Sequence, residues 1–205
     1  MNNLIDYKPK EGITTMISGK KVELRPVSLE DHKRTYHWRN DKETATFDAG
    51  SGYYRYSHVP LEQIEASYEK DIRTIDKREV GEFSIYTRGE DARHIGSIGY
   101  RSLDIIARRC VVGIGIGEKE LWGKGYGTDA LRALLHYLFN TMNLKRVQLD
   151  TWSGNARAIR AYEKCGFVVE GRLRNDAYID GKYYDTIVMG VLREEFEFNN
   201  EIVVN

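Results

Sequence analysis

The stretch Trp122-Gly-Lys-Gly-Tyr-Gly-Thr128 carries three glycines at alternate positions. It follows the small and β-branched residues Val111 to Gly117 and precedes a segment in which leucines recur at helical spacing. Glycine lets the backbone turn sharply and leaves no Cβ to hinder a ligand. A helix that starts there presents unpaired N–H groups and the positive end of its dipole. Strand, loop and helix together predict an anion site, for which pyrophosphate is the natural occupant.

Two other phosphate motifs do not fit this stretch. Lys124 is followed by Gly125 rather than by Ser or Thr, so the loop is not a P-loop. Gly113, Gly115 and Gly117 fall within an expected strand and do not open a helix, which excludes a dinucleotide-binding fingerprint. A tight strand-to-helix turn without a ligand remains the simplest alternative.

The composition is that of one globular domain. The chain has 205 residues, 41% apolar and 30% charged, with Lys+Arg and Asp+Glu both 31. A nucleic-acid-binding protein would show a basic excess, so we expect no nucleic-acid partner. We find no signal peptide and no apolar run of membrane-spanning length, and we expect a cytoplasmic protein without a membrane partner. Cys110 and Cys165 have no metal-ligand spacing and are expected to be reduced thiols.

Hydrophobic periodicity predicts alternating strands and helices. Strands are expected over 21–27, 83–87, 94–103, 110–116, 146–151, 167–171 and 186–192. Helices are expected over 28–40, 61–75, 131–142 and 155–165. Residues 41–58 are expected to form a loop, and residues 172–185 a linker with a turn at Asp180-Gly-Lys182. We divide the chain into an N-terminal extension (1–18), one domain (19–195) and a C-terminal tail or swapped strand (196–205).

From about Val22 to Glu195 the chain resembles the GNAT-fold N-acetyltransferases. It is most similar to the branch of the ribosomal-protein alanine acetyltransferases and the spermidine acetyltransferases. Their order and spacing make the matching motifs specific: Trp122-Gly-Lys-Gly-Tyr-Gly-Thr128, Asn155-Ala-Arg-Ala-Ile159, Tyr162-Glu-Lys-Cys-Gly-Phe167, Glu170-Gly171, Asp180-Gly-Lys-Tyr-Tyr-Asp185 and Met189. Trp122 stands where the general family signature has Gln or Arg, a departure that is usual in this branch.

The resemblance implies a single-domain α/β fold. Its mixed, mostly antiparallel sheet of six or seven strands would carry helices on both faces. Two central parallel strands, Cys110–Ile116 and Arg146–Thr151, would splay apart to admit acetyl-CoA. The implied activity is direct acetyl transfer from acetyl-CoA to a primary amine, on a protein N-terminus or a small molecule. The alternative is a non-catalytic acyl-CoA-binding or protein-interaction module. The sequence also allows a homodimer.

The resemblance also implies the site residues. Periodicity alone would make Tyr162 a core tyrosine, whereas the resemblance makes it the catalytic acid that protonates the departing CoA thiolate. No metal would take part. Asn155 would contact acetyl-CoA, cap its helix, or do both. Arg157, Arg160 and Lys164 could meet phosphate, although a solvated helix face is the favoured interpretation for each of them. The expected acetyl-CoA-binding residues are Ile114, Gly115, Ile116, Trp122, Gly123, Lys124, Gly125, Tyr126, Gly127, Thr128, Asn155, Ala158 and Lys164.

The general base and the acceptor stay open. Relatives in this branch often carry a glutamate where this chain has Val111. The base could be Glu118, Asp104, a residue of the first two helices, or a chain of waters. The polyamine enzymes keep a carboxylate at the Val111 position, so the sequence ranks an N-terminal or small-molecule amine above spermidine. Acidic and basic residues alternate over 31–75, where the acceptor cleft is expected, and local charge does not decide the acceptor.

Overall fold

An eight-stranded sheet organises the molecule, which the computed structural model describes over residues 17–74 and 79–196. Along the sheet the strands lie in the order β1-β2-β3-β4-β5-β6-β8-β7, and only β5 and β6 run parallel. The expected mixed, mostly antiparallel sheet is confirmed, and the additional eighth strand is the short β1. The strands are β1 (Ile17–Ser18), β2 (Val22–Pro26), β3 (Gly81–Thr87), β4 (His94–Asp104), β5 (Arg109–Ile116), β6 (Arg146–Trp152), β7 (Val168–Ile179) and β8 (Lys182–Leu192).

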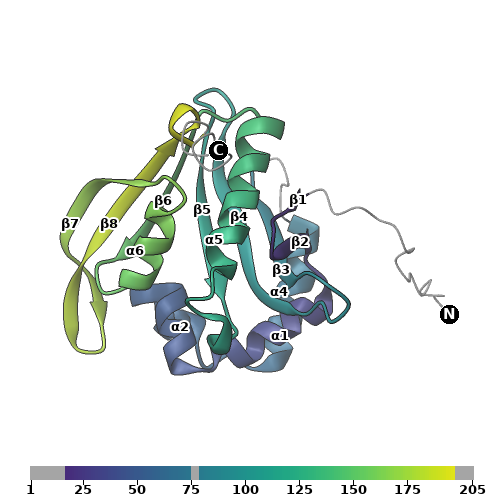
Figure 1. Ribbon diagram of the computed structural model, residues 1–205. Helices are drawn as coiled ribbons and strands as arrows, with labels where there is room; N and C mark the ends of the chain where they lie inside the picture. The colour runs from purple at the N-terminus through teal and green to yellow at the C-terminus, as the bar shows by residue number, and fades with distance from the viewer. Residues whose placement is uncertain (1–16, 75–78, 197–205) are drawn as a thin grey trace.

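Helices cover both faces of the sheet. Side chains alternate between the faces along a strand. On β3, Phe83 contacts Tyr137 at the end of the long central helix, whereas Ser84 donates a hydrogen bond to Asp31 of α1. In Figure 1, α5 and α6 cross the near side of the sheet, and α1 and α2 gather at its lower end. The helices are α1 (Leu29–Arg39), α2 (Lys42–Ala49), η1 (Gly50–Gly52), α3 (Tyr53–Tyr56), α4 (Leu61–Thr74), η2 (Lys119–Leu121), α5 (Tyr126–His136), η3 (Tyr137–Thr141) and α6 (Ala156–Glu163).

The two parallel strands separate after a short paired stretch. β5 pairs with β6 from Arg109 with Arg146 to Val111 with Gln148. Beyond Val111, β5 continues to Ile116 and β6 to Trp152 without pairing to each other. The expected splay is therefore present, and it leaves one edge of β5 open in the middle of the sheet.

The core lies mainly between α5 and the sheet. Leu131, Leu134, Leu135 and Leu138 are at most 1% exposed, as their spacing along one helical face predicts. The core also includes Phe196, whose ring contacts Phe139. Phe196 is the first residue of the segment expected as a C-terminal tail or swapped strand; the domain boundaries stay a prediction, and residues 197–205 lie outside the described part of the chain.

Two expected loops are in fact regular structure. Residues 42–49 form α2, because Asp41 caps it by accepting a hydrogen bond from the Thr44 N–H at 2.9 Å. The expected linker after Gly171 is continuous strand, since β7 and β8 pair as a long hairpin down to the turn at residues 180–181. Hydrophobic periodicity is missing from both elements, because the buried residues of α2, Thr44, Ala45 and Thr46, are consecutive and small or polar, and β7 is largely exposed.

Glycines at the end of β5 let α1 and α2 approach it closely. A Cβ on Gly117 would lie 1.9 Å from the ring of Trp38 in α1, and one on Gly115 would lie 2.0 Å from Oδ1 of Asp48 in α2. Such distances are impossible for real atoms, so a side chain at Gly117 would displace the Trp38 ring, and one at Gly115 would displace the Asp48 carboxylate. The alternating glycines of this strand are therefore packing sites for the first two helices.

Candidate active site

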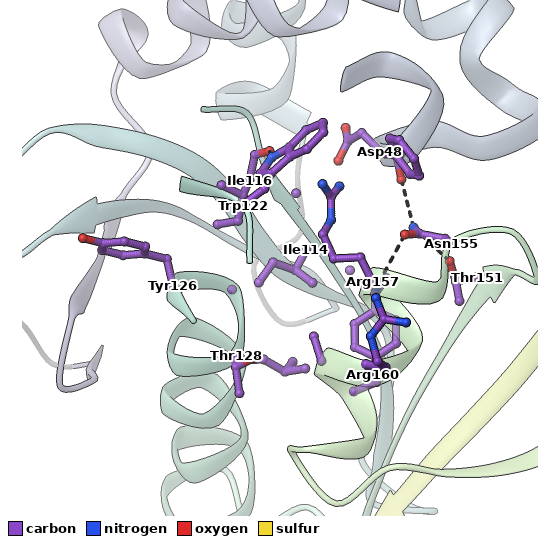
Figure 2. A pocket seen from close by; sticks show the side chains of 18 of the residues that line it. Asp48, Ile114, Ile116, Trp122, Tyr126, Thr128, Thr151, Asn155, Arg157 and Arg160 are labelled. Atoms are coloured by element: carbon purple, nitrogen blue, oxygen red, sulfur yellow. Dashed lines mark hydrogen bonds between the residues drawn. The ribbon is translucent and has the colours of Figure 1, made fainter. Parts of the chain in front are cut away.

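A cleft of about 610 Å³ opens where β5 and β6 diverge. Its walls are the end of β5, the glycine loop with the start of α5, the inner side of α6, and α2 (Figure 2). Each predicted site residue except Lys124 lines it. Those residues are Ile114, Gly115, Ile116, Trp122, Gly123, Gly125, Tyr126, Gly127, Thr128, Asn155, Ala158, Tyr162 and Lys164.

The glycine loop has the geometry of an anion-binding turn. Gly123 and Gly125 have φ values of 73° and 86°, the left-handed region in which a side chain is strained. Gly125 is the N-cap of α5, and its carbonyl accepts from the N–H of Asp129 at 3.0 Å. The N–H groups of the first turn precede that bond in the helix and have no intrahelical acceptor. They lie at the edge of the cleft, where the helix dipole favours negative charge.

Lys21, which belongs to none of the sequence motifs, lies beside this loop. Its Nζ donates to the carbonyl of Lys124 at 2.8 Å and lies 5.4 Å from the centre of the Tyr126 ring. Asp129 holds this part of β2 in place by accepting from the backbone N–H of Lys21 at 2.7 Å. The cation thus comes from a strand more than 100 residues away, and no local sequence signal indicates it.

Asn155 has a clear structural role. Its Oδ1 accepts from the N–H of Ala158 at 3.3 Å and so caps α6. Its Nδ2 is 3.4 Å from the carbonyl of Phe47 and from Oγ1 of Thr151. One buried side chain therefore joins α2, β6 and α6 (Figure 2). The predicted cap is confirmed, and a contact with acetyl-CoA stays a prediction.

Tyr162 lies on α6, almost two turns after Asn155, and is 8% exposed. Burial raises the pKa of its hydroxyl to about 12, and the negative charges of Asp48 and Asp150 act in the same direction. The phenol therefore stays protonated through the neutral range. A protonated donor that lines the cleft is what protonation of a leaving thiolate requires.

Arg157 is not on a solvated face. Its guanidinium lies 3.6 Å from the centre of the Trp122 ring and 4.8 Å from that of Phe47. Trp122 in turn donates from Nε1 to the carbonyl of Ile116 at 2.6 Å. A cation stacked on aromatic rings stabilises this wall of the cleft. Arg160 and Lys164 are exposed and also line the cleft. Their positions agree both with a solvated helix face and with a contact to phosphate.

A second recess, of about 330 Å³, adjoins the cleft on the far side of β5. The two hollows share Asp48, Arg101 and the backbone from Gly113 to Gly115. Glu82 of β3 also lines the recess. Desolvation by the walls, and then the charge of Asp71, raises the pKa of Glu82, although its side chain still reaches solvent. Two carboxylates thus face one small space.

Several expected candidates lie elsewhere. Glu118 pairs with Arg34 at 3.1 Å, and Asp104 accepts from the N–H of Ala107 at 2.8 Å; neither lines the cleft. Val111 lies in the paired part of β5, before the gap opens. Burial raises the pKa of the Cys165 thiol to about 12, in agreement with its interpretation as a small buried apolar residue.

The described residues contain neither a group of metal-ligating side chains nor a membrane-spanning helix. Residues 17–74 and 79–196 contain no group of three or more His, Cys, Asp or Glu side chains arranged to hold a metal ion. Within the same ranges, no helix has both the length and the apolar character needed to cross a membrane.

The fold and the cleft define an acyltransferase of the GNAT type, and comparison with known proteins agrees. The family model "Acetyltransferase (GNAT) domain" matches residues 21–168. An N-acetyltransferase of Bacillus subtilis (strain 168), the SPbeta prophage-derived uncharacterized protein YokL, is 38% identical over 187 residues, 91% of this chain and 98% of that protein. Spermidine N(1)-acetyltransferase of Escherichia coli (strain K12) is 27% identical over 88% of this chain and 91% of its own length.

The solved structures show the same fold. The crystal structure of spermidine N-acetyltransferase from Vibrio cholerae in complex with CoA and spermine superposes with a TM-score of 0.73. It is 24% identical and covers 86% of this chain and 98% of that one. The chain therefore belongs to the GNAT acetyltransferase family. It is an N-acetyltransferase that uses acetyl-CoA and is close to the spermidine acetyltransferases, as the sequence motifs predicted.

Proposed function

We propose that the protein binds acetyl-CoA in the cleft between β5 and β6 and transfers the acetyl group directly to a primary amine. The observation that carries this proposal is the junction of an opened strand edge with a glycine loop that starts a helix. Pyrophosphate would lie on the first turn of α5, beside Gly123, Gly125 and Gly127. Lys21, Arg160 and Lys164 would supply positive charge near the phosphates.

The pantetheine arm would follow β5. Ile114 and Ile116 direct their backbone groups to the same side, because these groups alternate along a strand. Trp122 already donates to the Ile116 carbonyl, so Ile114 is the better partner for the amide groups of the arm. This is strand addition with a ligand in place of a peptide.

The chemistry would take place at the inner end of the cleft. A backbone N–H of β5 would stabilise the negative charge that develops on the carbonyl oxygen of the acetyl group. Tyr162 would donate its proton to the CoA thiolate, and its pKa of about 12 keeps that proton available. Asn155 and Ala158 would hold α6, and with it Tyr162, against the cleft.

The acceptor would enter through the second recess. Its carboxylates, Asp48 and Glu82, attract a cation, with Asp71 adding negative charge behind Glu82. Val111 lies outside both hollows, so its lack of charge does not speak against a polyamine. Two relatives are named as spermidine acetyltransferases. We therefore place a small amine of the polyamine type first and a protein N-terminus second.

Steady-state kinetics test the acceptor. Purified protein, acetyl-CoA and either spermidine or a short peptide that begins with Ala or Ser are compared through release of the CoA thiol. We expect a clearly higher kcat/KM for spermidine. A higher value for the peptides would reverse the order of the two acceptors, whereas no thiol release with any amine would contradict the transfer itself.

Gly127→Ala tests the acetyl-CoA site. The new Cβ would lie 3.5 Å from Cγ1 of Ile116, an ordinary contact, and Ala favours a helix more than Gly does. The variant should therefore fold at least as well as the parent protein. If phosphate lies against this turn, acetyl-CoA affinity in calorimetry should fall about tenfold, equivalent to about 1.4 kcal/mol.

Gly52→Ala is the matched control, because a Cβ there meets nothing within 4 Å and the position is outside the cleft. It should bind acetyl-CoA like the parent protein. Unchanged affinity in folded Gly127→Ala and in the larger Gly127→Val would contradict the proposed position of the phosphates.

A further inference from the structure

Asp48 is the side chain that the cleft and the second recess share on the α2 side. It lies near the C-terminal end of α2, the helix whose Phe47 carbonyl is joined to the start of α6 through Asn155. Figure 2 shows Asp48 across the cleft from Thr128 and the start of α5. A group that enters from the recess toward the cleft therefore passes this carboxylate.

The carboxylate lies over one face of β5 at Gly115. Its Oδ1 is only 2.0 Å from the place that a Cβ of Gly115 would occupy. The contact places a negative charge beside Ile114, which we propose as the partner of the pantetheine arm. Asp48 is thus next to the end of the cleft where the thioester would lie.

The charge of Asp48 also acts on the hydroxyl of Tyr162. After burial, the negative charge of Asp48 is the next cause of the raised pKa of Tyr162, ahead of Asp150. The two groups therefore act across one space, from α2 and from α6. One can accept a proton and the other can donate one, which is the pair that aminolysis of a thioester needs.

Other carboxylates are placed less well. Glu118 and Asp104 are outside the cleft lining. Asp150 lines the cleft from β6, on the side away from the recess, and lies 4.0 Å from Arg101. Glu82 lines the recess and not the cleft. The charged and titratable groups that share these hollows with Asp48 are Glu82, Tyr100, Arg101, Tyr126, Asp150, Arg157, Arg160, Tyr162 and Lys164.

We propose that Asp48 is the general base, the group that takes the proton of the acceptor ammonium. This inference rests on the proposed amine acetylation. The ammonium gives one proton to Asp48, and the freed lone pair forms a C–N bond to the acetyl carbon. The C–S bond breaks, and the thiolate takes the proton of Tyr162. The amide nitrogen then loses its extra proton to the Tyr162 phenolate, and Asp48 releases its own proton to water, so that one proton leaves per turnover.

The pH dependence of Asp48→Asn tests the assignment. Asn has nearly the same size, so the variant should still fold and bind acetyl-CoA like the parent protein. At pH 7, kcat/KM for the amine should fall about 10²-fold or more, the usual contribution of a general base. Without a base the amine must arrive already neutral. The rate of the variant should therefore rise about tenfold per pH unit and approach that of the parent protein near the pKa of the amine.

Each other outcome has a definite meaning. A higher KM with unchanged kcat and an unchanged pH profile would make Asp48 a cation-binding residue and overturn the proposal. A larger loss in Asp150→Asn than in Asp48→Asn would assign the base to β6 and overturn it as well. Glu118→Gln is the control, and it should behave like the parent protein. An inactive parent protein with every amine would contradict the proposed function, and not this assignment alone.

Discussion

At the scale of single residues, the site depends on side chains with more than one role. Asn155 caps α6 and also bonds to the Phe47 carbonyl, so a motif residue expected at the cofactor orients the helix that carries Tyr162. Trp122 stands where the family signature has Gln or Arg, and its indole N–H donates a hydrogen bond to the Ile116 carbonyl. Tyr162 lines the cleft from α6, and its raised pKa keeps its hydroxyl protonated.

Tyr162→Phe isolates the hydroxyl. The ring that packs 6.1 Å from Phe167 is kept, so stability and acetyl-CoA affinity should change little. With a saturating acceptor, kcat should fall about 10²-fold, because the thiolate would leave unprotonated. Since burial raises the pKa of Tyr162 to about 12, the acid form persists at all lower pH values. The parent protein should accordingly lose no turnover near pH 10 through this group.

Tyr137→Phe is the control for this prediction. Tyr137 contacts Phe83 and lies outside the cleft, so its variant should keep full turnover. Equal rates for Tyr162→Phe and the parent protein would return Tyr162 to the role of a core residue.

At the scale of elements, α2 has the largest consequence for function. It was expected to be loop, yet it supplies Phe47 to the aromatic wall and Asp48 to the cleft. One sequence signal could have indicated it: Asp41 followed three residues later by Thr44, the spacing of an N-cap. Lys119, just after β5, forms an ion pair with Asp41, so the residue that caps α2 also connects this helix to the segment that follows β5.

Asp41→Ala should destabilise the protein by about 1 kcal/mol at pH 7, the usual effect of a lost N-cap. The Asp41 side chain is 42% exposed, so its ion pair with Lys119 adds little. The hydrogen bond from Lys119 lowers the pKa of Asp41 to about 2, from an ordinary value of 3.8. A lowered pKa stabilises the folded state above pH 3.8, and this stabilisation is lost as the pH falls toward 2.

Urea unfolding at pH 7 and at pH 3 measures this difference. The gap between Asp41→Ala and the parent protein should be smaller at pH 3. Asp41→Asn keeps the capping oxygen without the charge and should lose less stability than Asp41→Ala at pH 7. Equal losses in the two variants would show that the cap contributes nothing.

At the scale of the whole molecule, the zero net charge hides an uneven distribution of charged side chains. The chain is neutral overall, yet Lys21 is brought to the glycine loop, while Asp48 and Glu82 face the recess. Three backbone N–H groups, of Lys20, Lys21 and Val22, bond to Asp129 of α5 and hold β2 in this position. Under the proposed function, this separation would draw the phosphates of acetyl-CoA and the acceptor amine to different ends of one path.

Lys21→Met should weaken acetyl-CoA binding about fivefold at low ionic strength, because one cation near the helix start is lost. The factor should shrink at high salt, where charges are screened. Calorimetry at two salt concentrations gives both values. Acetyl-pantetheine, which lacks the nucleotide phosphates, should show no such loss.

Lys145→Met provides the matched change of charge outside the cleft, and it should leave affinity unaltered. A similar loss in Lys145→Met, or with acetyl-pantetheine, would show that Lys21 does not act through the phosphates.

Local sequence alone determined the family, the strand–loop–helix unit and the residues from Ile114 to Thr128 that line the cleft. It did so because glycine conformation, helix capping and hydrophobic spacing act over a few residues. The choice of Asn155 and Tyr162 came from the resemblance to the GNAT acetyltransferases, and their separation within one helix sets their common face.

Only the tertiary structure decided which distant groups join them. Lys21 reaches the loop across more than 100 residues, and Asp48 meets Gly115 through the packing of α2 on β5. Val111 shows the same limit: its sequence position suggested a missing base, yet the pairing of β5 with β6 places it before the cleft opens. Contacts of this kind depend on how whole elements pack, and no short-range pattern in the chain encodes them.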